Sequence, residues 1–208
     1  MADHIDEAPF ADPTQLEVLP EEGADREILA TDELEARLLS ALLWAPASLR
    51  RQIVDVLADR DSGRDPADDF WRPAHAYIFT HMVELTAAVG TDWTITDLNA
   101  RLTAHGQRFD AHKASWLTIV SPAADRAWSD TAGDIAQLAA EVIEARYRRG
   151  YRAVAVRMQQ LADDHSVSPA EFDAFATRMA GYRDRAQTRR LRRTYELEHL
   201  TDRAPVAA

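Results

Sequence analysis

Apolar residues recur every three or four positions along almost the whole chain, which is the spacing of a buried helix face. Leu34, Leu38 and Leu42 follow one another at steps of four, and the same pattern returns between Ile78 and Val89. No segment alternates apolar and polar residues as a half-buried strand does, and no repeat has a fixed period. The sequence therefore predicts an all-α fold, with a compact multi-helix globular domain, then an extended helical hairpin and a C-terminal basic helix.

Breaks in this pattern and shifts in charge divide the chain into four parts. Eleven acidic residues and one arginine occur in residues 1–33, and we expect residues 1–30 to form a disordered acidic arm, with a DNA-mimicking or partner-docking arm as the alternative. Residues 31–125 are expected to form the helical core, residues 126–165 the helical hairpin, and residues 166–208 a last helix with a basic cluster and a short tail. Gly150 favours a bend or reversal within the hairpin segment.

The composition excludes several classes of protein. The chain has no cysteine, which rules out disulfide bonds and thiolate metal sites and favours a reducing compartment. Its first residues are acidic and contain no apolar run, unlike a secretory signal, and no segment approaches the length of a membrane span. We therefore expect a cytoplasmic protein that does not associate with a membrane.

No arrangement of residues in the sequence predicts catalysis. The chain contains neither a Gly-x-x-x-x-Gly-Lys phosphate loop nor a Gly-x-Gly-x-x-Gly motif, so any ATPase or helicase activity would need another chain. His75 and His81 are six residues apart and would point to different faces of a helix, which argues against a shared metal ion. We expect no enzyme activity, no catalytic or metal-binding residue and no cofactor.

The segment after residue 130 changes to a heptad-like pattern, in which apolar residues from Tyr147 to Leu161 alternate steps of four and three. An extended helix must bury such a face, and a second copy of the chain gives the simplest two-fold solution. The alternative is that the final helix, with Phe172, Phe175 and Met179, folds back over the stripe within one chain. The predicted dimerisation surface consists of Ile135, Leu138, Val142, Tyr147, Tyr151, Val154, Met158 and Leu161.

A basic cluster lies in the last predicted helix, where six arginines and one acid occur from Arg183 to Arg193. Spacings of three and four place several of these arginines on one side of a helix, where they would neutralise the phosphates of DNA. The alternatives are a solvated helix end whose cations complement the helix dipole, and a contact with the acidic arm or another acidic partner. The candidate nucleic-acid contacts are Arg185, Arg189, Arg190, Arg192 and Arg193.

The most distinctive block of the sequence runs from Asp69 to Phe79 and reads Asp-Phe-Trp-Arg-Pro-Ala-His-Ala-Tyr-Ile-Phe. It resembles the Asp-Phe-aromatic-x-Pro-x-His-x-x-Ile-Phe stretch in the N-terminal domain of the replicative hexameric helicase, the DnaB family, and the resemblance extends over residues 34–162. We expect His75 to be structural, bonding a nearby loop, rather than catalytic. The motif residues expected in the core are Phe70, Trp71, Pro73, His75, Ile78 and Phe79.

The resemblance implies a collar domain whose paired hairpins assemble a ring and dock primase, but not DNA unwinding, because the family's ATPase motor has no counterpart in these 208 residues. We expect an adaptor or assembly protein of DNA replication, a protein-interaction module of the primosome. It would self-associate as a dimer or higher oligomer and bind a helicase or primase. The alternatives are a DNA-binding regulator that uses the arginine cluster, and the N-terminal part of a split or truncated helicase.

Overall fold

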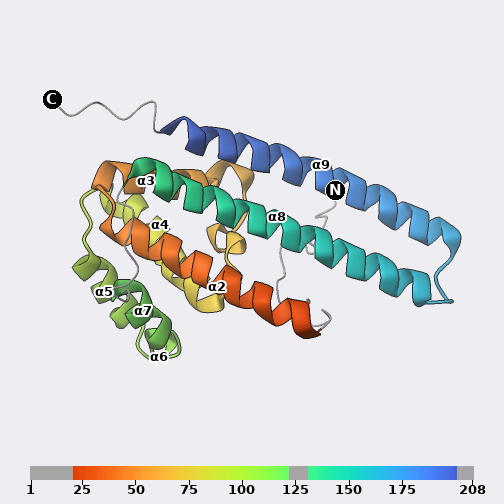
Figure 1. Ribbon diagram of the computed structural model, residues 1–208, viewed down its shortest axis with the longest axis horizontal. Helices are drawn as coiled ribbons and strands as arrows, with labels where there is room; N and C mark the ends of the chain where they lie inside the picture. Colours follow the sequence, from red (N-terminus) through yellow and green to blue (C-terminus); the bar gives the residue numbers. More distant parts are fainter. Residues whose placement is uncertain (1–20, 122–130, 201–208) are drawn as a thin grey trace.

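The computed structural model describes residues 21–121 and 131–200, and these residues form helices and no strand, which confirms the all-α class. A globular group of shorter helices packs against two long helices that run side by side (Figure 1). In chain order, the elements are α2 (Glu21–Trp44), α3 (Ala47–Ala58), the 3-10 turns η2 (Arg60–Ser62) and η3 (Pro66–Asp69), α4 (Pro73–Val89), α5 (Ile95–Ala104), α6 (Gln107–Asp110), α7 (Lys113–Val120), α8 (Ala132–Asp163) and α9 (Pro169–Glu198).

The ends of the helices follow from local chemistry. Thr94 and Asp97 form a capping box at the start of α5, in which each side chain accepts a hydrogen bond from the other residue's backbone N–H. Ser168 and Glu171 form a second capping box at the start of α9. Gly90 ends α4 with a φ of 72°, a conformation that only glycine adopts without strain. These residues set where the core helices and the hairpin begin.

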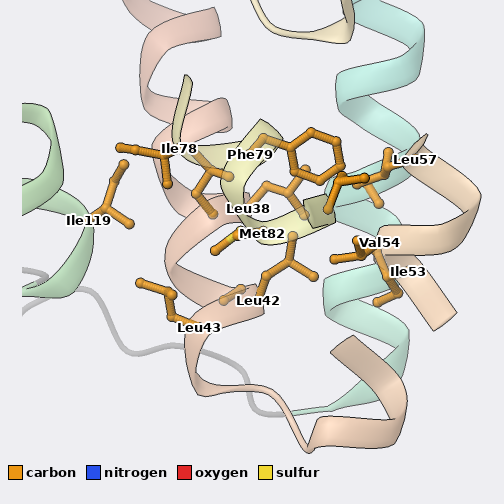
Figure 2. Packing of buried hydrophobic residues seen from close by; sticks show 14 of the residues in the cluster. Leu38, Leu42, Leu43, Ile53, Val54, Leu57, Ile78, Phe79, Met82 and Ile119 are labelled. Atoms are coloured by element: carbon orange, nitrogen blue, oxygen red, sulfur yellow. The ribbon is translucent and has the colours of Figure 1, made fainter. Parts of the chain in front are cut away.

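The core lies where α2, α3 and α4 meet, as Figure 2 shows. Leu38 and Leu42 of α2, Ile53 of α3, and Phe79 and Met82 of α4 are all completely buried. Each such side chain contributes about 1.5–3 kcal/mol by leaving water, so this contact is a main source of the fold's stability. The core is closed by buried residues of α5, α7 and α8: Leu98, Leu102, Trp116, Ile119, Ile135, Ala139, Val142 and Ile143.

The hairpin differs from the one that the sequence predicts. α8 is a single helix of 32 residues that continues through Gly150, so the expected bend or reversal at this glycine is wrong. The hairpin is formed instead by α8 with α9, which means that residues 126–165 do not contain both of its arms. A helical glycine costs only about 1 kcal/mol relative to alanine, and the packing of α8 on α2 and α9 exceeds this.

The first helix begins earlier than expected. α2 starts at Glu21, whereas the sequence predicts an arm up to residue 30. The remainder of the predicted arm, residues 1–20, lies outside the described residues, as do residues 122–130 and 201–208.

Candidate functional site

A buried carboxylate, that of Glu35 in α2, organises the base of the hairpin. It is fully buried and accepts hydrogen bonds from the backbone N–H groups of Trp71 and Arg72, just before α4 begins. His75 Nδ1 lies 3.0 Å from this carboxylate, so the partner of His75 is Glu35 and not a loop. Arg149 of α8 places its Nη1 3.8 Å from the same group. Glu35 therefore joins α2, the start of α4 and the hairpin.

The other residues of the Asp69–Phe79 block follow the predicted core pattern only in part. Phe70, Ile78 and Phe79 are buried, and the ring centroids of Phe70 and Phe79 lie 4.8 Å apart. Pro73 occupies the first position of α4, where its missing N–H removes no helical hydrogen bond. Trp71 is only half-buried and Pro73 is exposed, so the prediction that Pro73 lies in the core is wrong. The block is thus a packing element at the junction between the core and the hairpin.

Arg193 of α9 attaches the end of the hairpin to the core. Its Nε donates to the carbonyl of Val56 (3.1 Å) and its Nη2 to that of Leu57 (2.9 Å), and these carbonyls lie at the C-terminal end of α3. Nη2 also forms an ion pair with the buried carboxylate of Asp69. Burial alone would raise the pKa of Asp69, but the charge and hydrogen bond of Arg193 hold it below its usual value. The pair is therefore ionised.

The predicted nucleic-acid contacts have internal partners for the most part. Three of the five form ion pairs within the chain, and these pairs are Arg190 with Glu144, Arg192 with Asp59, and Arg193 with Asp69. Arg193 is also buried, so the prediction that it contacts DNA is wrong. Arg185 is exposed and lies over the ring of Tyr182, while Arg189 is half-buried. The main role of these arginines is to hold α9 against the rest of the protein, because their acidic partners lie on neighbouring elements.

An arginine-lined cleft, named here the arginine cleft, opens between α8, α9 and the segment that contains η3. Its volume is about 370 Å³, open solvent included, and five of its nine lining residues are arginines with a single acid among them. The lining residues are Arg64, Asp69, Ile143, Arg146, Tyr147, Ala186, Arg189, Arg190 and Arg193. Sequence reasoning missed Arg64 and Arg146, because each stands outside the basic cluster and joins it only when three segments pack together.

Arg146 has the most unusual environment in this cleft. Its Nη2 is buried and makes no hydrogen bond within the described residues, and the same is true of Nε of Arg190. Burial, together with the neighbouring charge of Arg64, lowers the pKa of Arg146 to about 10. Arg146 thus remains protonated at neutral pH, with part of its donor capacity unused. This arrangement favours the binding of an anion.

The predicted dimerisation surface separates into two parts. Ile135 and Val142 are buried in the core, and Leu138 is packed against it. The remaining positions lie on the hairpin, where Tyr151 is 43% exposed. Half-buried side chains occupy the other hairpin positions, namely Tyr147, Val154, Met158 and Leu161.

The final helix covers part of this stripe, as the alternative interpretation predicts. Met179 and Tyr182 of α9 are buried, and Val154 and Phe175 pack against them as a small second hydrophobic cluster. Phe175 remains half-buried there, as does Phe172 near the start of α9. The intramolecular contact between the two arms therefore leaves much of the apolar row only partly covered.

Two further features bear on the chemistry of the chain. No helix in residues 21–121 or 131–200 combines the length and the apolar character that a membrane span requires. The same residues contain no group of three His, Asp or Glu side chains placed to hold a metal ion.

Comparisons of the chain with protein-family models, with curated proteins and with solved structures find no match.

Proposed function

We propose that this chain is a protein-interaction module of DNA replication that pairs with a second copy of itself through the outer hairpin, meaning residues 151–163 of α8 and 169–180 of α9. The observation that supports this function is the shape of the hairpin. Along the long axis of the molecule, α8 and α9 extend past the end of α2, beyond the reach of the globular core (Figure 1). Any apolar side chain that the two arms leave uncovered there has no core on which to pack within residues 21–121 and 131–200.

The outer hairpin carries a row of such side chains. Val154, Met158 and Leu161 on α8, and Phe172 and Phe175 on α9, are all half-buried. Covering the remaining half of each contributes roughly 1 kcal/mol, so five side chains from each of two copies contribute on the order of 10 kcal/mol. Association costs about 4–15 kcal/mol. The balance fits a reversible dimer, and a two-fold axis lets one patch cover its own equivalent.

The assignment to replication comes from the resemblance of the Asp69–Phe79 block to the helicase collar. A globular domain followed by a long hairpin agrees with the paired hairpins that this resemblance implies. A helicase or a primase is accordingly the partner that we propose, with the chain as an adaptor or assembly protein. A DNA-binding regulator is less well supported, since Arg190, Arg192 and Arg193 are held in ion pairs.

The test of pairing is the mass of the full chain in solution, measured by sedimentation equilibrium from low to high micromolar concentration. The wild type should dimerise, and the double variant Val154→Asp with Met158→Asp should be monomeric, because it places charges in an apolar interface. The matched control is Ala155→Asp with Gln159→Asp, which adds the same charges to exposed positions of the same helix. It should dimerise as the wild type does.

A wild type that stays monomeric throughout, or two double variants with equal masses, would refute the pairing. If the first double variant loses its helical circular dichroism, Leu161→Cys supplies a second test. The chain has no other cysteine, so this residue is a unique thiol at the hairpin end. Mild oxidation should then give covalent dimers at protein concentrations where Gln159→Cys, on the exposed face, gives few.

The replication partner is tested separately, with a replicative helicase and a primase from the native host. Fluorescence anisotropy of the labelled chain should increase with one of them. Binding of neither protein would refute the assignment to replication and leave the dimer unaffected.

A further inference from the structure

The arginine cleft brings together cations from three separate segments. Arg64 comes from the segment between η2 and η3, Arg146 from α8, and Arg189, Arg190 and Arg193 from α9. Three of these arginines form ion pairs with carboxylates. Nη2 of Arg64 lies 2.8 Å from Oδ2 of Asp68, Arg190 pairs with Glu144, and Arg193 pairs with Asp69. Arg146 forms no ion pair with a described residue, so the cleft keeps a cation beyond these three pairs.

Two guanidinium nitrogens in this cleft have no hydrogen-bond acceptor among the described residues. Nη2 of Arg146 and Nε of Arg190 are buried and have no hydrogen-bond partner among the described residues. A buried donor without a partner costs about 1–3 kcal/mol, and more when it belongs to a charged group. A ligand that accepts a hydrogen bond from such a donor removes this free-energy penalty when it binds. The lowered pKa of Arg146 agrees with this, since burial and the charge of Arg64 disfavour the cation more than Asp69 and Asp68 favour it.

We propose that the arginine cleft binds the terminal phosphoryl group of a small anionic ligand. Several planar guanidinium groups that line one cleft suit a tetrahedral oxyanion, which accepts hydrogen bonds on several oxygens at once. The donors are also recessed, because the unpartnered nitrogens of Arg146 and Arg190 are buried. A terminal phosphoryl group reaches into such a cleft, whereas the diester backbone of duplex DNA is contacted by protruding side chains.

A bound phosphoryl group would act at the base of the hairpin. It would join α8, α9 and the segment that contains Arg64. The Arg193–Asp69 pair already holds α9 to η3 at the same place. A ligand that binds only the folded state raises the melting temperature as its concentration rises. This site is distinct from the outer hairpin and does not depend on dimerisation.

The experiment is isothermal titration calorimetry on the full chain at constant ionic strength, with pyrophosphate, ADP and adenosine as probes. Pyrophosphate or ADP should bind and raise the melting temperature, and adenosine, which lacks a phosphoryl group, should not. Binding of both anions would indicate a general phosphoryl site, and a clear preference for ADP would identify a nucleotide as the source. No heat and no melting shift with either anion at millimolar concentration would overturn the proposal.

Arg146→Gln should weaken binding of the anion at least about tenfold, the loss of one charge-assisted hydrogen bond from a buried group. Arg148→Gln is the matched control, since it removes the same charge from an exposed position of α8 outside the cleft, and its affinity should stay within about twofold of the wild type. Equal weakening by the two variants would show diffuse electrostatic attraction and overturn the site.

A second variant guards against misfolding of the first. Ala186→Glu places a carboxylate on the cleft wall at a helical position, and it should also abolish binding of pyrophosphate while the protein stays helical. Retained binding in this variant would overturn the proposal. So would duplex DNA that binds in an Arg146-dependent manner while pyrophosphate and ADP do not bind.

Discussion

Replacing Arg193 with methionine should lower the free energy of unfolding by about 3–5 kcal/mol, the usual effect of removing one partner from a buried ion pair. Methionine retains most of the length and apolar volume of the side chain, so the change removes charge and donors rather than packing. The carboxylate of Asp69 then stays buried without its partner, and the carbonyls of Val56 and Leu57 lose their donor. With a total stability of about 5–15 kcal/mol expected for a domain, the effect is large.

The assay is unfolding in urea, which does not screen charges as guanidinium salts do. Arg183→Met is the control on the same helix, because the side chains of Arg183 and Asp184 are 50% and 66% exposed and such a pair contributes about 0–1 kcal/mol. A double-mutant cycle of Arg193→Met with Asp69→Asn isolates the interaction of the pair. Additive effects in the cycle, or a loss below about 1 kcal/mol for Arg193→Met, would refute the reasoning.

The same pair gives a dependence on pH. Because Arg193 holds the pKa of Asp69 below its unfolded value of 3.8, the ion pair stabilises the fold above that pH and is lost as Asp69 becomes protonated in acid. In Arg193→Met, burial without this partner raises the pKa of Asp69 above 3.8, so the stability difference between wild type and variant should begin to narrow as the pH falls through that raised value and should keep narrowing below 3.8. A difference that stays constant down to pH 2 would show that Asp69 does not carry the effect.

Three further changes test other parts of the core. Burial lowers the pKa of His81 below its unfolded value of 6.5, so the unfolded state binds a proton at a higher pH than the folded state does. As the pH decreases from about 6.5, the melting temperature should therefore decrease less steeply in His81→Gln than in the wild type. Glu35→Gln should lower the free energy of unfolding by about 3–5 kcal/mol in urea, because the buried carboxylate accepts from the Trp71 N–H and lies 3.8 Å from Nη1 of Arg149. Arg50→Met should lower it by about 1.5–3 kcal/mol, since Arg50 donates to the carbonyl of Trp93 and lies 3.8 Å from the centre of its ring; a loss below about 0.5 kcal/mol in either variant would contradict these contacts.

The helices and most of the core are determined by local sequence. Steps of three and four place Leu38 and Leu42 on one face whatever the rest of the chain does, and both are buried. Pro73 fixes the start of α4 in the same way, because proline is tolerated only in the first turn. Gly150 shows the limit of such reasoning, since a cost of about 1 kcal/mol for a helical glycine is smaller than the packing energy of a long helix between two neighbours.

The partners of the charged residues were decided only by the tertiary structure. Arg193 meets Asp69 across 124 positions of sequence, and Arg192 meets Asp59 across 133. An arginine carries no signal of whether it faces water, a phosphate or a buried carboxylate, because that depends on which elements dock beside it. The arginine cleft has the same origin: Arg64 and Arg146 join the α9 cluster only after the hairpin packs on the core. Periodicity along one helix is a local property, whereas the compensation of a charge depends on segments that are distant in the chain.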